Sequence, residues 1–269
     1  SSAGVATITY TLPAGCFVTM PVTINSNPAA VSGASTVCVG LSTTMTDATS
    51  GGTWSTSNTA VGSISAGGVL TGVSAGVINV TYALATGCIA VSAMTVNPLP
   101  AAITGPGTVC EGSNITLSDV TTGGLWSSSN TAQATVVSGT GVVTGVLAST
   151  PTITYTLPTG CIATAPITVN PTPVAITGVS TLCTGASSIF TDATSGGTWS
   201  SSNLLIATVG SSTGIVTAVL AGNVNISYTL PTGCAAIRPM TINTQPAAIT
   251  GASSICFGST PLIIPKKRL

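Results

Sequence analysis

Apolar and polar residues alternate along most of this chain, in short runs separated by glycine and proline. In one such run, residues 224–230 read Val-Asn-Ile-Ser-Tyr-Thr-Leu. A period of two predicts β-strands with one buried face. No stretch has helical periodicity, so the pattern predicts an all-β protein. Although the mean hydropathy is +0.65, no apolar run approaches the ~20 residues of a membrane-spanning helix, and we expect the chain not to span a membrane.

The pattern also repeats at a long, nearly constant spacing. Tyrosine, tryptophan and two series of cysteines recur with a period of about 72 residues, which predicts a tandem array of small domains. These positions are Tyr10, Tyr82, Tyr155 and Tyr228; Trp54, Trp126 and Trp199; Cys16, Cys88, Cys161 and Cys234; and Cys38, Cys110, Cys183 and Cys256.

Proline-containing segments at 96–100, 169–173 and 242–246 mark the ends of the repeats. Proline has no N–H donor and a fixed φ, so these segments end one sheet and form short, fairly stiff linkers. The predicted division gives three whole repeats, 28–99, 100–172 and 173–245. Residues 1–27 form the C-terminal part of a repeat, and residues 246–269 form the N-terminal part of a further one.

One repeat contains about seven short strands. In the middle repeat we expect a split first strand over residues 101–110 and further strands near 115–117, 125–127, 134–136 and 142–145. A closing hairpin follows over 153–169, with its turn at 158–160. Seven short strands joined by Gly/Pro turns predict a β-sandwich.

Composition argues against catalysis. Charged residues make up 3% of the chain and histidine is absent, so a serine triad lacks its usual base. The acids are Glu111 and one aspartate per repeat, namely Asp47, Asp119 and Asp192. Paired carboxylates would have to come from different repeats. We therefore predict no enzyme activity, no catalytic residues and no cofactor.

The repeated aspartate has two interpretations. It lies where the second strand ends, a position at which an aspartate side chain commonly accepts a hydrogen bond from nearby backbone. The alternative is a calcium site, but calcium takes six to eight oxygens, usually from several carboxylates. We predict the turn bond and no metal site.

The cysteines point to an oxidising, extracellular or cell-surface location. Eight cysteines on a strict repeat suggest disulfides, and a domain of about 72 residues buries only about 60% of its unfolded surface. Zinc binding is disfavoured because the chain has no Cys-x-x-Cys pair and no histidine.

The repeat resembles a known family. Residues 51–58 read Gly-Gly-Thr-Trp-Ser-Thr-Ser-Asn, residues 68–73 Gly-Val-Leu-Thr-Gly-Val, and residues 75–82 Ala-Gly-Val-Ile-Asn-Val-Thr-Tyr. With the copies at 123–130 and 196–203, this order resembles the bacterial immunoglobulin-like domain of group 2, over essentially the whole chain. The added cysteine pair resembles repeats in very long secreted surface proteins of Bacteroidota. The resemblance implies immunoglobulin-like sandwiches in adhesin stalks and surface fibres, and it supplies no catalytic residues.

In such a sandwich, the early cysteine of a repeat lies at the end that faces the next domain. The late cysteine lies at the end that faces the previous domain. A strand of seven residues spans about 23 Å, whereas bonded cysteines need Cα atoms within ~7 Å. This favours the cross-domain pairs Cys38–Cys161 and Cys110–Cys234, with the other four cysteines bonded outside this stretch.

Two other pairing schemes stay open. The within-repeat scheme joins Cys38–Cys88, Cys110–Cys161 and Cys183–Cys234. A third joins Cys88–Cys110 and its equivalents. A non-reducing peptide map distinguishes all three.

We expect Trp54, Trp126 and Trp199, with Tyr82, Tyr155 and Tyr228, to fill the sandwich cores. An exposed tryptophan stacking on sugar is the alternative. Asn79, Asn114 and Asn225 lie in Asn-x-Ser/Thr triplets, so glycans are a hypothesis that an intact mass would test. The basic tail Lys266, Lys267 and Arg268 has too few charges to predict nucleic-acid binding.

The sequence therefore predicts a structural, non-catalytic segment of an extracellular fibre or adhesin stalk, stiffened by proline linkers and disulfides. Its expected partners are neighbouring repeats or identical subunits. The alternative is an array of carbohydrate- or protein-binding modules, or the spacer of a larger secreted protein.

Overall fold

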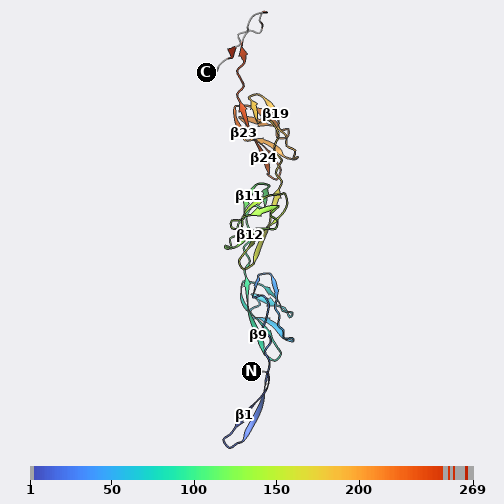
Figure 1. Cartoon of the computed structure of the whole chain (residues 1–269), viewed down its shortest axis with the longest axis vertical. Helices are drawn as coiled ribbons and strands as arrows, with labels where there is room; N and C mark the ends of the chain where they lie inside the picture. The colour runs from blue at the N-terminus through green and yellow to red at the C-terminus, as the bar shows by residue number, and fades with distance from the viewer. Residues whose placement is uncertain (1–2, 251–253, 255–256, 258–263, 266–269) are drawn as a thin grey trace.

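The computed structural model describes residues 3–250, 254, 257 and 264–265. It forms three two-sheet units in a row, with a separate hairpin beyond the first unit (Figure 1). We call the units the first, second and third sandwich and define them by their strands below. Within the described residues there is no helix that could cross a membrane.

The first sandwich comprises β3–β9. Its four-stranded sheet has the order β3-β9-β8-β5, and its three-stranded sheet has the order β4-β7-β6. The strands are β3 (Thr36–Cys38), β4 (Ser42–Thr44), β5 (Thr53–Thr56), β6 (Gly62–Ile64), β7 (Val69–Gly72), β8 (Gly76–Ala83) and β9 (Ile89–Asn97).

The second sandwich repeats this topology with β10–β17. Its last strand is divided into β16 and β17 at Ile167, whose N–H bonds to the in-register Pro151 carbonyl, because Pro151 has no N–H to return the bond. The strands are β10 (Thr108–Cys110), β11 (Asn114–Thr116), β12 (Leu125–Ser128), β13 (Ala134–Val136), β14 (Val142–Gly145), β15 (Thr152–Thr156), β16 (Ile162–Pro166) and β17 (Thr168–Asn170).

The third sandwich has the strand orders β18-β24-β23-β20 and β19-β22-β21. Its strands are β18 (Thr181–Cys183), β19 (Ser187–Ile189), β20 (Thr198–Ser201), β21 (Ala207–Val209), β22 (Ile215–Ala218), β23 (Gly222–Thr229) and β24 (Ala235–Asn243). The all-β, immunoglobulin-like fold class predicted from the sequence is confirmed. The division at 27/28, 99/100, 172/173 and 245/246 stays a prediction.

The opening strand of each repeat is split between the two sheets, as predicted. Its first part forms an isolated antiparallel bridge, such as Ser32 with Thr46. Its second part pairs in parallel with the last strand, as β3 does with β9. The chain therefore contributes to both sheets before the hairpin-connected strands begin.

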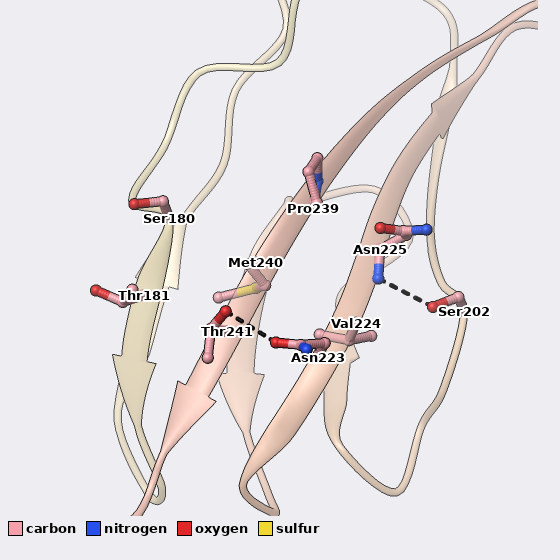
Figure 2. Close-up of a pocket in the computed structure, with 9 residues that line it drawn as sticks. All are labelled: Ser180, Thr181, Ser202, Asn223, Val224, Asn225, Pro239, Met240 and Thr241. Carbon is pink, nitrogen blue, oxygen red and sulfur yellow. Dashed lines mark hydrogen bonds between the residues drawn. The ribbon is translucent and has the colours of Figure 1, made fainter.

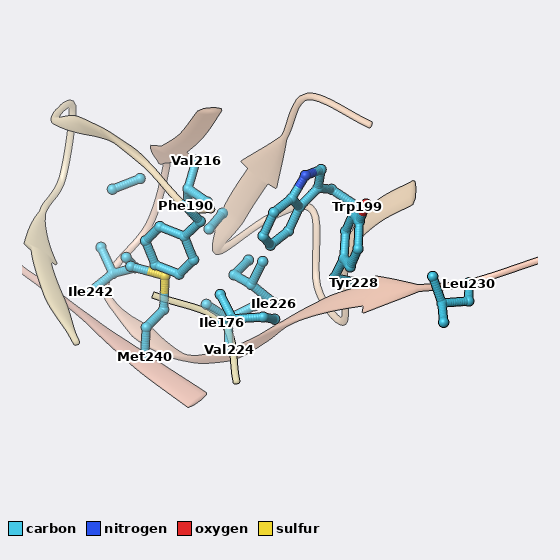
Figure 3. Packing of buried hydrophobic residues seen from close by; sticks show 12 residues of the cluster. Ile176, Phe190, Trp199, Val216, Val224, Ile226, Tyr228, Leu230, Met240 and Ile242 are labelled. Atoms are coloured by element: carbon cyan, nitrogen blue, oxygen red, sulfur yellow. The ribbon is translucent and has the colours of Figure 1, made fainter. Parts of the chain in front are cut away.

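Each sandwich encloses its own hydrophobic core. In the third core, Phe190, Met240 and Ile242 pack towards one end, and Trp199 lies against Tyr228 towards the other (Figure 3). The two rings have centroids 4.7 Å apart. No buried cluster joins residues of two sandwiches in the described part of the chain, so each sandwich has the interior of an independent folding unit.

A glycine before the fifth strand of each sandwich is required by the packing. Gly68, Gly141 and Gly214 have φ of +81°, +71° and +66°. A Cβ at Gly141 would overlap the Leu117 carbonyl oxygen and press on the Trp126 ring. Only glycine combines this left-handed backbone with so close an approach.

The hairpin at the N-terminal end stands alone. It pairs β1 (Gly4–Thr11) with β2 (Phe17–Ile24), and no second sheet packs on it among the described residues. At the other end, β25 (Ile249–Thr250) pairs with β26 (Ile264–Pro265). The basic tail 266–268 and Cys256 lie outside the described residues.

Candidate functional site

The early cysteine of each repeat lies at the trailing end of its sandwich, where the chain leaves. Cys38 is the last residue of β3 and pairs with Asn97 of β9. Asn97 directly precedes the linker Pro98-Leu99-Pro100. Because β3 and β9 run parallel, both strands deliver their last residues to this end.

The late cysteine lies at the leading end, where the chain enters. Cys161 follows the turn between β15 and β16. In that turn Gly160 has φ +83° and donates to the Leu157 carbonyl at 2.9 Å, and Leu157 donates to the Cys161 carbonyl at 2.9 Å. The turn therefore fixes the cysteine backbone beside the incoming linker.

Two disulfides cross the junctions between sandwiches. Cys38 bonds to Cys161 and Cys110 to Cys234, with Cα–Cα distances of 5.7 and 5.6 Å. These are the pairs that the fold argument favoured. Since each sulfur takes one partner, the within-repeat pairs and Cys88–Cys110 are not formed. The junction, with its linker and its disulfide, is the candidate functional site.

The other described cysteines occupy the same two repeat positions. Cys16 and Cys183 are exposed and Cys88 is half-buried, and none of the three is bonded within the described part of the chain. Cys88 is a late cysteine and Cys183 an early one, so the two sit at the outer ends of the three-sandwich row. Each thus lies where a further junction would place its disulfide.

Polar contacts reinforce the second junction. Glu111, next to Cys110, accepts from the Ala148 N–H at 2.7 Å and from the linker residue Thr172 N–H at 3.4 Å. The Thr172 hydroxyl also donates to the Glu111 carbonyl at 2.9 Å. These bonds fix the linker to the trailing end of the second sandwich. This role of Glu111 was not predicted from the sequence.

A second repeated arrangement, which we call the tyrosine anchor, fixes the leading end. In the first sandwich it consists of Asp47, Thr49, Gly52 and Tyr82. The Tyr82 hydroxyl donates to the Thr49 carbonyl at 2.7 Å and accepts from the Gly52 N–H at 2.8 Å. The Thr49 hydroxyl accepts from the N–H of Ala29, at the start of the repeat, at 2.9 Å. The anchor thus ties the incoming chain to the core.

The aspartate of the anchor makes the predicted turn bond. Asp47 Oδ1 accepts from the Thr49 N–H at 2.7 Å, and Asp119 and Asp192 accept likewise from Thr121 and Thr194. The other oxygen, Oδ2, is buried without a hydrogen-bond partner among the described residues in all three copies. The described residues contain no cluster of three potential metal-ligating side chains. The geometry thus supports the turn bond.

Removing the tyrosine hydroxyl should destabilise a sandwich. Tyr155 is buried, and its hydroxyl donates to the Thr121 carbonyl at 2.7 Å and accepts from the Gly124 N–H at 2.8 Å. We expect Tyr155→Phe to cost roughly 1–3 kcal/mol in the unfolding free energy of the second sandwich, because two backbone groups lose their partner.

Tyr10 provides the matched control for that measurement. It holds the same repeat position but is 67% exposed on the isolated hairpin. Chemical denaturation should place Tyr10→Phe within about 0.5 kcal/mol of the parent. Equal effects of the two substitutions would contradict the role of the anchor.

The predicted core residues lie in the sandwich interiors. Trp126, Trp199, Tyr82, Tyr155 and Tyr228 are buried, and Trp54 is half-buried. Each tryptophan packs on the tyrosine of its own sandwich with ring centroids 4.6–4.7 Å apart. One side of each indole is therefore in contact with a tyrosine ring. The asparagines at 79, 114 and 225 are exposed, and a glycan at these sites stays a hypothesis.

The third sandwich also carries an open groove of about 510 Å³ (Figure 2). It lies where β18 separates from β24, beside Pro239, which has no N–H to pair. Asn223 accepts from the Thr241 hydroxyl at 2.9 Å, and Ser202 accepts from the Asn225 N–H at 2.9 Å. None of the lining residues is charged or aromatic. The groove therefore offers hydroxyl and amide contacts but neither an acid–base pair nor a stacking platform.

Comparison with known families agrees with this architecture. Residues 163–236 match the family described as bacterial Ig-like domain (group 2). Residues 163–236 are therefore similar to a bacterial Ig-like domain. The match begins in β16 and ends in β24. The first and second sandwiches have the same strand order and the same Trp–Tyr pair, so the chain is a tandem array of immunoglobulin-like domains.

The chain is also similar to several solved structures at low sequence identity. A C-terminal fragment of intimin, solved with the intimin-binding domain of Tir, has 18% identity, covers 55% of this chain and 67% of that chain, and gives a TM-score of 0.38. Invasin, described as a bacterial integrin-binding protein, has 16% identity, with coverages of 93% and 68% and a TM-score of 0.35. Domains 1–6 of the surface layer protein SbsC have 17% identity, with coverages of 94% and 47% and a TM-score of 0.26.

No curated protein sequence matches the chain significantly. What intimin and invasin bind is a property of those proteins, because one fold hosts many functions.

Proposed function

We propose that this Ig-like array is a non-catalytic segment of an extracellular stalk or fibre that transmits tension through disulfide-locked domain junctions. The observation that carries the proposal is that both disulfides cross a junction, Cys38–Cys161 and Cys110–Cys234. Disulfides persist in oxidising compartments, which supports a location outside the cell.

The choice of partners is better explained by mechanics than by stability. In the loop-closure model, a disulfide that closes the loop Cys38–Cys88, of about 50 residues, contributes about 4 kcal/mol, and one that closes the longer loop Cys38–Cys161 contributes about 5 kcal/mol. This difference is small. The mechanical difference is large, because only the cross-domain bond prevents neighbouring domains from separating or bending freely about the proline linker.

The strand arrangement is suited to the same task. When the disulfides are reduced, tension enters a domain through its opening strand and leaves through its last strand. In the first sandwich these are β3 and β9, which are parallel and joined by Val39 N–H to Asn97 C=O and Thr95 N–H to Ser35 C=O, each 3.0 Å. Opposed forces on parallel strands load these bonds in shear, so they must break together.

The test is the shape of single molecules by electron microscopy, with and without reductant. We expect straight rods with a narrow spread of junction angles, and a broader spread after reduction or in the variant Cys38→Ser/Cys161→Ser. Cys183→Ser, at an exposed cysteine outside the disulfides, is the matched control. An unchanged spread after reduction would contradict the proposal and favour a flexible spacer or binding module.

A further inference from the structure

The hairpin β1–β2 has the architecture of a closing hairpin without the sandwich around it. Its register pairs Ala6 with Val22, Ile8 with Met20 and Tyr10 with Val18. These six side chains share one face, because the cross-strand pairs alternate between faces. The opposite face carries Thr7, Thr9, Thr11 and Thr19 among others. The hairpin is therefore amphipathic, like the hairpins inside the sandwiches.

The apolar face of this hairpin is uncovered. Ile8 is 58% exposed, whereas its equivalent Val80 is 0% exposed. Tyr10 is 67% exposed, whereas Tyr82 is 6% exposed. An apolar face that is buried in every other copy and open in this one indicates a contact surface.

The first sandwich identifies what covers such a face. Val80 packs in a cluster that includes Val37, Met45 and Leu70, all of which precede β8. Tyr82 also needs Thr49 and Gly52 for its hydroxyl and Trp54 for its ring. All of these residues lie within 28–72, the opening part of a repeat.

We propose that the apolar face of β1–β2 is a docking surface for the opening strands of an Ig-like repeat of this same kind. We further propose that Cys88 forms a disulfide with the early cysteine of the docked segment. This inference rests on the equivalence of the repeats and goes beyond the stalk role, which concerns the junctions between whole sandwiches.

The assignment of Cys88 follows from the two observed bonds. In each, the early cysteine of one sandwich joins the late cysteine of the next one along the chain. A segment that completes the hairpin 1–27 creates a sandwich before the first one. Its early cysteine then faces Cys88, which is half-buried and free in the described structure. Cys16, in the completed sandwich itself, is at the opposite end.

Bond formation needs an oxidant, for which we name oxidised glutathione. The two thiols, on Cys88 and on the docked segment, lose two protons and two electrons as the S–S bond forms. One molecule of oxidised glutathione takes up both electrons and both protons and gives two molecules of reduced glutathione. The bonds Cys38–Cys161 and Cys110–Cys234 are unchanged.

The probe is an isotope-labelled peptide with the sequence of residues 28–72, added to the full chain with oxidised glutathione. The label separates Cys38 of the peptide from Cys38 of the chain. We expect a one-to-one covalent complex whose non-reducing map joins the peptide's Cys38 to Cys88. A bond to Cys16 or Cys183 instead, or no complex, would overturn the proposal.

Substitutions on the two faces of β1 provide matched controls. Ile8→Asp on the apolar face should reduce the yield of complex at least tenfold, whereas Thr7→Asp on the opposite face should leave it unchanged. Cys88→Ser should abolish the covalent product and retain binding in size-exclusion chromatography. Equal effects of Ile8→Asp and Thr7→Asp would show that the face is not the docking surface.

A fusion keeps the test decisive if the isolated peptide aggregates. Because Tyr10 is the equivalent of Tyr82, Ser1 is the equivalent of Val73, so placing residues 28–72 directly before Ser1 restores the repeat spacing. We expect the fused segment to protect β1–β2 from hydrogen exchange and to bond to Cys88. A fused segment that leaves the hairpin unprotected would overturn the docking surface. Dimers of the unfused chain joined Cys183 to Cys16, the early-to-late pair at the leading end of the completed sandwich, would instead identify a second copy as the occupant.

Different results would contradict the stalk role and the docking surface. Flexible junctions in electron microscopy would overturn the stalk role and leave the peptide experiment unaffected. Failure of the peptide and the fusion would leave the junctions Cys38–Cys161 and Cys110–Cys234 as they are.

Discussion

Reduction should lengthen the fully stretched chain by about 145 residues, or about 480–520 Å at about 3.3–3.6 Å per residue. With both disulfides intact, the shortest covalent path from Pro28 to Asn243 runs through both bonds. It uses only the segments 28–38, 110–161 and 234–243, about 70 residues in all, whereas the path without the bonds follows the whole chain and is about 215 residues long. Single-molecule force spectroscopy, with handles before Cys38 and after Cys234, measures the difference directly.

The single-bond variants make this prediction specific to overlapping loops. Removing only Cys38–Cys161 should lengthen the path by about 21 residues, and removing only Cys110–Cys234 by about 22, or roughly 70–80 Å each. Removing both disulfides should release far more chain length than the two single removals added together. In each single-bond variant, the disulfide that remains still bypasses most of the chain. Within-repeat bonds would each release about 50 residues, or roughly 165–180 Å, and these lengths would add up. That result would contradict the cross-domain pairing.

This behaviour has a functional consequence for a stalk. In a reduced array, a domain that unfolds under tension lengthens the stalk by the whole contour length of its chain. In the oxidised array, a domain that unfolds can release only the part of its chain that lies on the shortest path. The disulfides therefore limit the extension of the stalk after a domain unfolds. They also limit bending at the junctions while the domains are folded.

Much of the fold could be predicted because the same sequence pattern occurs in several repeats. Alternation over residues 224–230 recurs in the other closing hairpins, and the Trp–Tyr pairing recurs in all three sandwiches. The aspartate turn bond was predictable as well, because an aspartate at a strand end has few other backbone partners.

The partners of the tyrosine hydroxyl were harder to predict. Thr49 and Gly52 are far from Tyr82 in the chain, and only the folded loop brings them together. A signal was present, because the aspartate is followed two positions later by threonine in each copy, at 49, 121 and 194. Recognising a shared Asp-x-Thr motif would have suggested a shared role for the threonine.

Features that occur in one repeat were not predictable. Arg238 donates to the carbonyls of Ile176 at 3.2 Å and Gly178 at 2.5 Å. The equivalent positions in the other repeats hold Ala165 and Ser92. The periodic pattern contains no information on such local departures from the repeat.

Trp126→Ala should unfold the second sandwich selectively. Trp126 is 7% exposed and its ring lies 4.7 Å from that of Tyr155. Truncating a buried tryptophan costs about 3–5 kcal/mol, whereas a domain of about 70 residues has a total stability of roughly 4–10 kcal/mol. Since the three cores are separate, the first and third sandwiches should keep their stability.

Differential scanning calorimetry should therefore resolve a new transition, at least about 12 °C below that of the parent. Hydrogen exchange should assign it to residues 100–172. Leu125→Ala is the matched control, because Leu125 is adjacent and 62% exposed, and it should change stability by no more than about 0.5 kcal/mol. If Trp126→Ala instead shifts one common transition for the whole chain, the disulfide-locked junctions couple the sandwiches into a single cooperative unit, and the array transmits stability as well as tension.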